Sequence, residues 1–166
     1  MIKIDKIYTK GGDTGQTSLG NGDRVYKHSL RISAQGDIDE TNAAIGLALL
    51  HSEQEAIKSL TRIQNDLFDL GADIARPGSE IDGNLRIQSS QVNWLEDEID
   101  NVNGALEPLR SFILRGGNEF AAFLHLACTV CRRAERSMAA LADEEAINTE
   151  ALKYINRLSD LLFVMA

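Results

Sequence analysis

From position 37 onward, apolar residues recur every three or four positions, which is the spacing of amphipathic α-helices. This pattern predicts five helices, the first beginning at about 37 and the others over about 53–76, 88–102, 118–141 and 148–166. Asp37, followed by Glu40 three residues later, predicts a capping box at the start of the first helix. The residues expected to face the core of the first three helices are Ile38, Ala44, Ile45, Ala48, Leu49, Leu60, Ile63, Leu67, Leu70, Ile74, Val92, Leu95 and Ile99.

Residues that stop helices separate these segments. Pro77-Gly78 is expected to end the second helix, Gly104 to close the third, and Asn148 to cap the fifth. Residues 78–85 are expected to form a polar connector, and 106–117 a linking segment. With no internal repeat and no convincing strand, the predicted fold class is all-α, a single domain over 1–166 built as an antiparallel five-helix bundle.

The stretch before the first helix has a different composition. Residues 8–28 contain five glycines among Thr, Ser, Asp and Asn, with almost nothing to bury, so they are predicted to form a loop. Glycines let backbone amides approach a polyphosphate closely, and Lys10 adds charge. No GK[ST] sequence follows the glycines, so this is not a Walker A loop. Composition alone leaves two interpretations open, a phosphate-binding loop and a flexible N-terminal arm.

Composition and charge limit the classes of function. The chain has 166 residues, 43% of them apolar and 25% charged, which is typical of one soluble globular domain. A net charge of −8 argues against nucleic acid and anionic membranes as partners. No apolar run fits a signal peptide or a membrane span, and two cysteines give no disulfide framework. We therefore expect a cytoplasmic protein.

Two arginines on the fourth predicted helix are candidates for binding an anion. Arg132 and Arg136 lie one turn apart on the same face, where like charges repel unless an anion lies over them. Arginine can also form two parallel hydrogen bonds with phosphate oxygens. The alternative is a solvated helix face in which Glu135 neutralises Arg132.

The last helix offers a second set of polar residues. Asn156 and Asp160 are one turn apart and flanked by apolar residues, so the amide is a candidate for reading a base or ribose edge. The alternative is the ordinary polar stripe of an amphipathic helix.

The spacing of His125, Cys128 and Cys131 resembles that of metal ligands, but it does not predict a metal site. A structural zinc site needs four ligands, and a second Cys/His pair is missing. Successive members of this series also point around the helix rather than toward one ion. The two cysteines are therefore predicted to be small core residues.

Taken together, these residues resemble the ATP:cob(I)alamin adenosyltransferases of the propanediol-utilisation type. The resemblance runs nearly from end to end of the chain. It rests on Tyr8-Thr9-Lys10-x-Gly12-Asp13-x-Gly15-x-Thr17-Ser18-Leu19, Gly36-x-x-Asp39-Glu40-x-Asn42, Ile45-Gly46, Phe112-Ile113-Leu114-x-Gly116-Gly117, Cys131-Arg132-Arg133-Ala134-Glu135-Arg136 and Asn156-Arg157-Leu158-Ser159-Asp160-Leu161-Leu162-Phe163.

The resemblance implies a homotrimer that binds ATP between subunits and transfers its 5′-deoxyadenosyl group to the cobalt of cob(I)alamin, releasing triphosphate. Arg132, Phe112 and Asp39 would be the catalytic residues; Asp39 would pair with Arg132 across the interface and Phe112 would lie on the cobalamin side. Mg²⁺ would be held mainly by the ATP phosphates. The implied ATP-binding residues are Thr9, Lys10, Gly12, Asp13, Gly15, Thr17, Ser18, Lys27, Arg132, Glu135, Arg136 and Asn156.

The resemblance also leaves an alternative, an ATP-binding regulatory or cobalamin-delivery module without efficient transfer. The resemblance further implies a cobalamin-dependent client enzyme and a cobalt reductase as partners. The chain departs from the family pattern at Arg115, where proline is frequent, and at Cys128, where arginine is frequent. Ser33 and Gln35 replace a glutamate and a tyrosine. These departures bear on affinity, interface stability and contacts to the lower face of the corrinoid.

Overall fold

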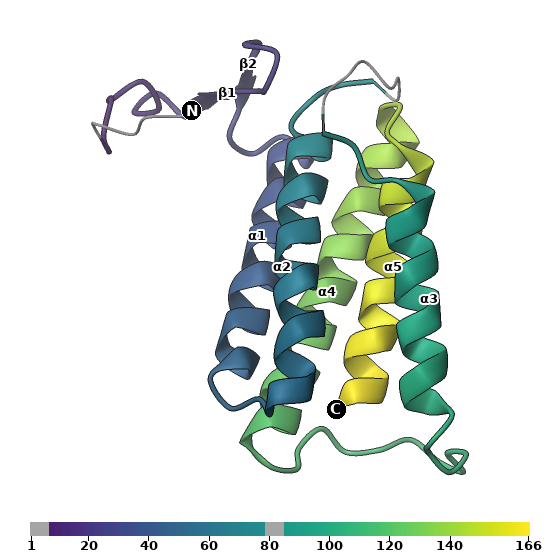
Figure 1. Cartoon of the computed structure of the whole chain (residues 1–166). Helices are drawn as coiled ribbons and strands as arrows, with labels where there is room; N and C mark the ends of the chain where they lie inside the picture. Colours follow the sequence, from purple (N-terminus) through teal and green to yellow (C-terminus); the bar gives the residue numbers. More distant parts are fainter. Residues whose placement is uncertain (1–6, 79–84) are drawn as a thin grey trace.

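The computed structural model describes residues 7–78 and 85–166 and confirms the five-helix bundle. The polar connector lies mostly in 79–84, outside the described residues. α1 packs against α2 and α4, and α5 packs against α4 and α3, as Figure 1 shows. The helices are α1 Leu30–Leu49, α2 Gln54–Ile74, α3 Ser89–Asn103, α4 Glu119–Glu144 and α5 Thr149–Met165.

The first helix begins earlier than the apolar pattern predicts. Its N-cap is Ser29 and its first residue is Leu30, so the predicted capping box at Asp37 is wrong. Asp37 lies inside α1 and accepts a hydrogen bond of 2.5 Å from the hydroxyl of Ser137 on α4. The early turns escaped prediction because Arg31, although polar, is buried: it donates to the carbonyl of Ile74 at 2.7 Å and pairs with Glu145.

The other helix ends agree with the prediction to within a few residues. Asn118 caps α4 by accepting a hydrogen bond from the amide of Ala121, and Asn148 caps α5 by accepting one from the amide of Glu150. Gly104 is the C-cap residue of α3. α4 continues three residues past its predicted end, to Glu144.

The prediction that the chain has no strand is wrong. β1 Gln16–Ser18 and β2 Arg24–Tyr26 form an antiparallel hairpin in which Thr17 lies opposite Val25. Strands of three residues are too short to show an alternating pattern. The buried side chain of Leu19, and a 2.9 Å hydrogen bond from the amide of Gly20 to the carbonyl of Ala75, attach the hairpin to the end of α2.

The core is formed by the apolar faces of all five helices, and the predicted core residues of α1, α2 and α3 are buried except Leu49 and Ile99, which are partly buried. Cys128 and Cys131 are buried free thiols, as predicted, and they donate to carbonyls of α5 at Ser159 and Ile155. Burial raises the pKa of both cysteines, so both thiols stay protonated at neutral pH.

Candidate functional site

The Gly-rich stretch folds as a turn followed by the hairpin. The amide of Gly15 donates to the carbonyl of Gly12 at 3.1 Å, and the amide of Lys27 donates to the carbonyl of Gly15 at 2.9 Å. The Lys27 ammonium lies over Gly12: a Cβ built on that glycine would be 2.8 Å from the lysine Nζ. Lys27 and Gly12 are therefore brought together, as the resemblance implies for an ATP site.

Arg24, which the sequence did not single out, holds this turn in place. Its guanidinium donates to the carbonyl of Gly11 at 2.7 Å and to the hydroxyl of Ser18 at 3.2 Å. The remaining predicted loop residues, Thr9, Lys10, Asp13 and Thr17, lie in or beside the same turn, and all but Thr17 are exposed. The loop thus presents backbone amides and two ammonium groups to solvent.

A second group of candidate residues lies where α4 faces α5. The amide nitrogen of Asn156 donates to Glu135 Oε1 at 2.8 Å, and Asn156 Oδ1 accepts from Arg157 at 2.6 Å. Glu135 therefore fixes the orientation of the Asn156 amide. Arg136 donates to the backbone carbonyl of Arg132 at 2.9 Å.

Arg132 is not neutralised by Glu135, which was the alternative interpretation. Within the described part of the chain it forms no ion pair, and its guanidinium carbon lies 6.0 Å from the centre of the Phe163 ring. An unpaired guanidinium at this position is available for an anionic ligand. Asp160, one turn from Asn156, is exposed.

Arg132 and Phe112 line one cavity of about 450 Å³, between the linking segment and α4 and α5. The cavity residues are Leu109, Arg110, Ser111, Phe112, Ile113, Arg115, Arg132 and Phe163. Phe112 is fully exposed, with a relative accessibility of 106%, so it is not a core residue of this chain. Sequence reasoning missed Phe163 as a cavity residue, although its spacing of seven from Asn156 places both on one helix face.

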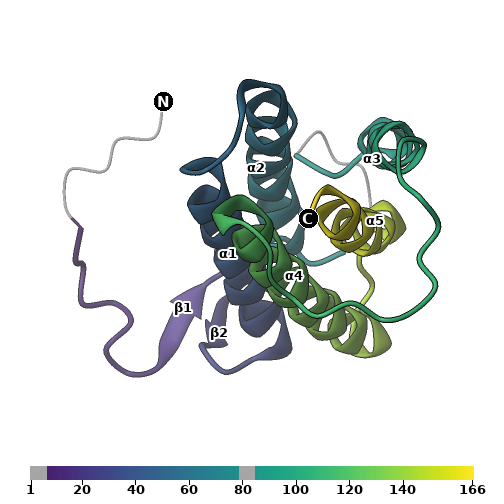
Figure 2. The ribbon, with the colours of Figure 1, turned by 90° about the horizontal axis from the view of Figure 1, so that it is seen from below.

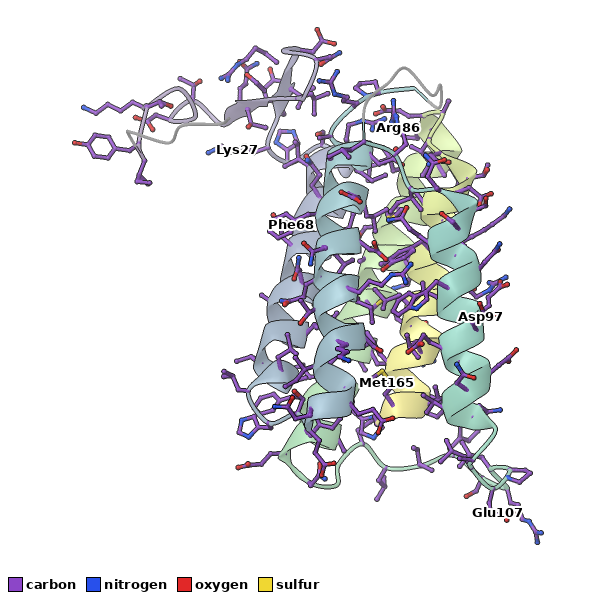
Figure 3. The ribbon with its side chains drawn as sticks, in the orientation of Figure 1. Lys27, Phe68, Arg86, Asp97, Glu107 and Met165 are labelled. Atoms are coloured by element: carbon purple, nitrogen blue, oxygen red, sulfur yellow. The ribbon has the colours of Figure 1, made fainter. Side chains whose placement is uncertain are left out.

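The loop and the cavity lie apart within this chain. The loop and hairpin extend outward from the start of α1, whereas the linking segment passes beneath the opposite end of the bundle (Figures 1 and 2). Figure 3 places Lys27 near the first of these ends, and Glu107, which belongs to the linking segment, at the other. None of the residues that line the cavity comes from the N-terminal loop.

Asp39 is exposed on α1 and has no hydrogen bond or ion pair within the described residues. The acidic residues of α1 that contact α4 in the same subunit are Asp37 and Glu40, and both pair with Arg133 rather than Arg132. The distance from Arg133 Nε to Asp37 Oδ1 is 3.3 Å. An Asp39–Arg132 pair between subunits is not tested by a single chain and stays a prediction.

Within residues 7–78 and 85–166, no group of three or more His, Cys, Asp or Glu side chains is arranged to hold a metal ion. No helix in those ranges is both long and apolar enough to cross a bilayer.

Comparison with known proteins gives matches over nearly the whole chain. Residues 7–166 match the family model described as cobalamin adenosyltransferase. A cobalamin adenosyltransferase of Cupriavidus metallidurans is 46% identical over 166 residues, which cover 99% of this chain and 88% of that protein. A corrinoid adenosyltransferase of Bacillus subtilis is 45% identical over 166 residues, which cover 97% and 84%.

Solved structures show the same fold. A phenylalanine-to-alanine variant of the PduO-type ATP:corrinoid adenosyltransferase from Lactobacillus reuteri, complexed with cobalamin and ATP, superposes with a TM-score of 0.91 at 38% identity, covering 96% of this chain and 91% of that one. An arginine-to-lysine variant of an enzyme of that type from the same organism, complexed with ATP, superposes with a TM-score of 0.88 at 39% identity, covering 96% and 91%.

Proposed function

The chain belongs to the cobalamin adenosyltransferase family and is an ATP:corrinoid adenosyltransferase that forms adenosylcobalamin, and from this premise we propose how its residues carry out the reaction. The observation that carries the proposal is the position of Arg132. Its guanidinium lines the cavity that also contains Phe112 and Phe163, and it has no carboxylate partner in the described chain. One side chain thus adjoins both a polar helix face and an aromatic cavity.

ATP binds between the Gly-rich loop and the polar faces of α4 and α5. The loop contributes Lys10 and Lys27 together with the backbone amides around Gly12 and Gly15, which suit a polyphosphate. Thr9, Asp13, Thr17 and Ser18 complete the loop side. The helices contribute Arg132, Glu135, Arg136 and Asn156, and the Glu135–Asn156 bond orients the amide that reads the nucleoside.

The chemical step forms a bond between cobalt(I) and the 5′ carbon of ATP while the bond from that carbon to the triphosphate oxygen breaks. The electron pair of the cobalt makes the new bond, and the broken bond's pair leaves with the triphosphate. Negative charge therefore gathers on the leaving oxygen, where Arg132 and the lysines stabilise it. No proton is transferred, so the reaction needs no general base.

Mg²⁺ fits this site as an ion carried by the nucleotide. The described residues offer no cage of carboxylates, and Mg²⁺ is commonly held by substrate phosphates with one or two protein ligands. When bound it would share the neutralisation of the triphosphate charge. Asp13 in the loop is the acidic residue available nearby.

The lower face of the corrinoid lies over the cavity between Phe112 and Phe163, whose volume of about 450 Å³ is too small for the whole molecule. The Phe112 ring beneath the cobalt excludes water and the lower axial ligand. The lone pair of that ligand raises the energy of the cobalt orbital that must accept an electron. Removing that ligand makes reduction of cobalt(II) to cobalt(I) easier. The full exposure of Phe112 in the subunit supports this role, because a buried core residue could not meet a substrate.

The active site is shared between the subunits of a homotrimer. The separation of the loop from the cavity within one subunit supports this arrangement, because each half then needs a neighbour. Asp39, exposed on α1 and without a partner in its own described chain, pairs with Arg132 of the adjacent subunit.

The experiment that tests the function mixes ATP, Mg²⁺ and chemically reduced cobalamin with the protein and follows the absorbance spectrum. Formation of adenosylcobalamin with one inorganic triphosphate per turnover, dependent on Mg²⁺, is the expected result. Binding of ATP without a cobalt–carbon bond would instead identify a regulatory or delivery module.

A further inference from the structure

The linking segment between α3 and α4 is attached to the bundle through Arg115. From 105 to 118 this segment contains no helix or strand, and Phe112 and Leu114 are almost completely exposed on it. Arg115 Nη1 lies 3.2 Å from Nδ1 of His125 on α4. The same guanidinium lies 5.0 Å from the centre of the Phe163 ring on α5, within the range of a cation–π contact.

His125 is suited to accept this hydrogen bond. It is 4% exposed, and its ring lies 6.5 Å from that of Phe163. Burial lowers the pKa of His125, and the charge of Arg115 lowers it further, so the ring is neutral at physiological pH. Because guanidinium nitrogens only donate, Nδ1 is the acceptor and the ring proton is on Nε2.

The charge of Arg115 is not balanced by a nearby carboxylate among the described residues, and Arg132, a second cation, lies 6.0 Å from the same Phe163 ring. The stabilising contacts of Arg115 are the His125 lone pair, the Phe163 ring and a hydrogen bond with the Cys128 side chain. All three belong to α4 or α5, so they fix a point of the segment against these helices.

That fixed point is close to Phe112. Three residues of extended chain reach at most about 11 Å, so holding Arg115 confines Phe112 to the mouth of the cavity. On the other side, Gly117 has a φ of +115°, a conformation that a residue with a side chain rarely adopts. Arg115 is thus the last side-chain anchor before the glycine turn into α4.

We propose that Arg115 is a positioning residue, which through His125 and Phe163 holds the segment that carries Phe112 in the orientation needed to close the lower face of the corrinoid. This proposal rests on the proposed function of Phe112. It assigns to Arg115 and His125 no contact with ATP or with the reacting atoms.

The first test uses the enzyme without substrates, so that it does not depend on activity. Trypsin cleavage after Arg110 reports how freely the segment leaves the bundle. Arg115→Gln and His125→Leu are expected to accelerate this cleavage at least about threefold, while His125→Asn, which keeps an acceptor near the position of Nδ1, retains the wild-type rate. Glu107→Gln, in the same segment but outside the cavity, is the control. Equal cleavage rates in all variants would overturn the proposal.

The second test measures turnover from cobalt(II) with a chemical reductant and, separately, from pre-reduced cobalt(I). In Arg115→Gln, the turnover rate is expected to fall about tenfold when the reaction starts from cobalt(II) and less than about twofold when it starts from cobalt(I), with ATP affinity unchanged. The spectrum of four-coordinate cobalt(II) should weaken in parallel in Arg115→Gln, whereas His125→Asn should keep the wild-type spectrum. Equal losses from both cobalt states would show a merely structural role. The two proposals can fail separately. If the wild-type protein forms no adenosylcobalamin from cobalt(I) while the variants show the expected trypsin cleavage rates, the proposed function is refuted and the Arg115 anchor stands.

Discussion

The ammonium of Lys27 occupies the space that a side chain on Gly12 would need, with Nζ 2.8 Å from the position of a Cβ. Gly12→Ala should displace the lysine head, which can move cheaply because it is the end of a flexible chain. We expect the KM for ATP to rise about tenfold, the loss of one charge-assisted contact, with the melting temperature within about 2 °C of wild type.

Gly11→Ala is the matched control for this change. A Cβ there would meet only the hydroxyl of Thr9, at an ordinary 3.6 Å, and Gly11 has no positive φ. Steady-state kinetics over ATP concentration compares the two variants. An equal rise in KM for both would mean that the loop, and not the lysine, was disturbed.

Mixed oligomers test whether the sites are shared. In the proposed site, Lys10→Ala would damage the loop half and Asn156→Ala the helix half, so each pure variant should be nearly inactive. If each site takes its loop from one subunit and its helices from the next, an equal mixture reassembled into trimers regains about a quarter of wild-type activity. Activity that stays at the level of the pure variants after verified subunit exchange would place the whole site in one chain.

Asp39 and Asp37 should behave differently when each is changed to Asn. Asp39 is exposed without a partner in its own described chain, so its loss should weaken assembly, seen as dissociation of the trimer in sedimentation. Asp37 bonds Arg133 and Ser137 within the subunit, so its loss should lower the melting temperature and leave the oligomeric state intact. Unchanged assembly and activity in Asp39→Asn would remove this residue from the interface.

The helices could be predicted from the sequence wherever apolar spacing was regular, as in α2 and α5. The start of α1 could not, because the buried Arg31 donates its hydrogen bonds to the end of α2 and to Glu145, both far away in sequence. Arg115 and His125 were invisible as a pair for the same reason: their contact depends on how an irregular segment lies against α4. The resemblance pointed to Arg132 and Phe112, and the structure adds that both line one cavity.

Arg132→Lys should lower kcat strongly although the positive charge is kept. A lysine is a point donor and cannot contact a phosphate, a carboxylate and an aromatic face at once as a planar guanidinium does. We expect a loss on the order of a hundredfold in kcat, with ATP still bound. Arg133→Lys is the control, because Arg133 pairs with Asp37 and Glu40 instead of lining the cavity. Near wild-type turnover in Arg132→Lys would reduce Arg132 to a surface residue.

Phe112→Ala should separate the reduction of cobalt from the transfer step. Because the side chain is fully exposed in the subunit, truncation should change the stability of the fold by no more than about 0.5 kcal/mol, in contrast to the 3–5 kcal/mol expected for a core phenylalanine. ATP affinity should also stay constant, because we propose that Phe112 contacts the corrinoid and not ATP. Turnover from cobalt(II) should fall sharply, since water or the native base can then return to the metal. Turnover from pre-reduced cobalt(I), which has little affinity for a lower ligand, should fall much less.

Leu114→Ala provides the control, because Leu114 is equally exposed two residues away and does not line the cavity. Melting curves, ATP titration and the two turnover assays decide together: equal losses from both cobalt states, or the same loss in Leu114→Ala, would show that Phe112 does not act by displacing the lower ligand.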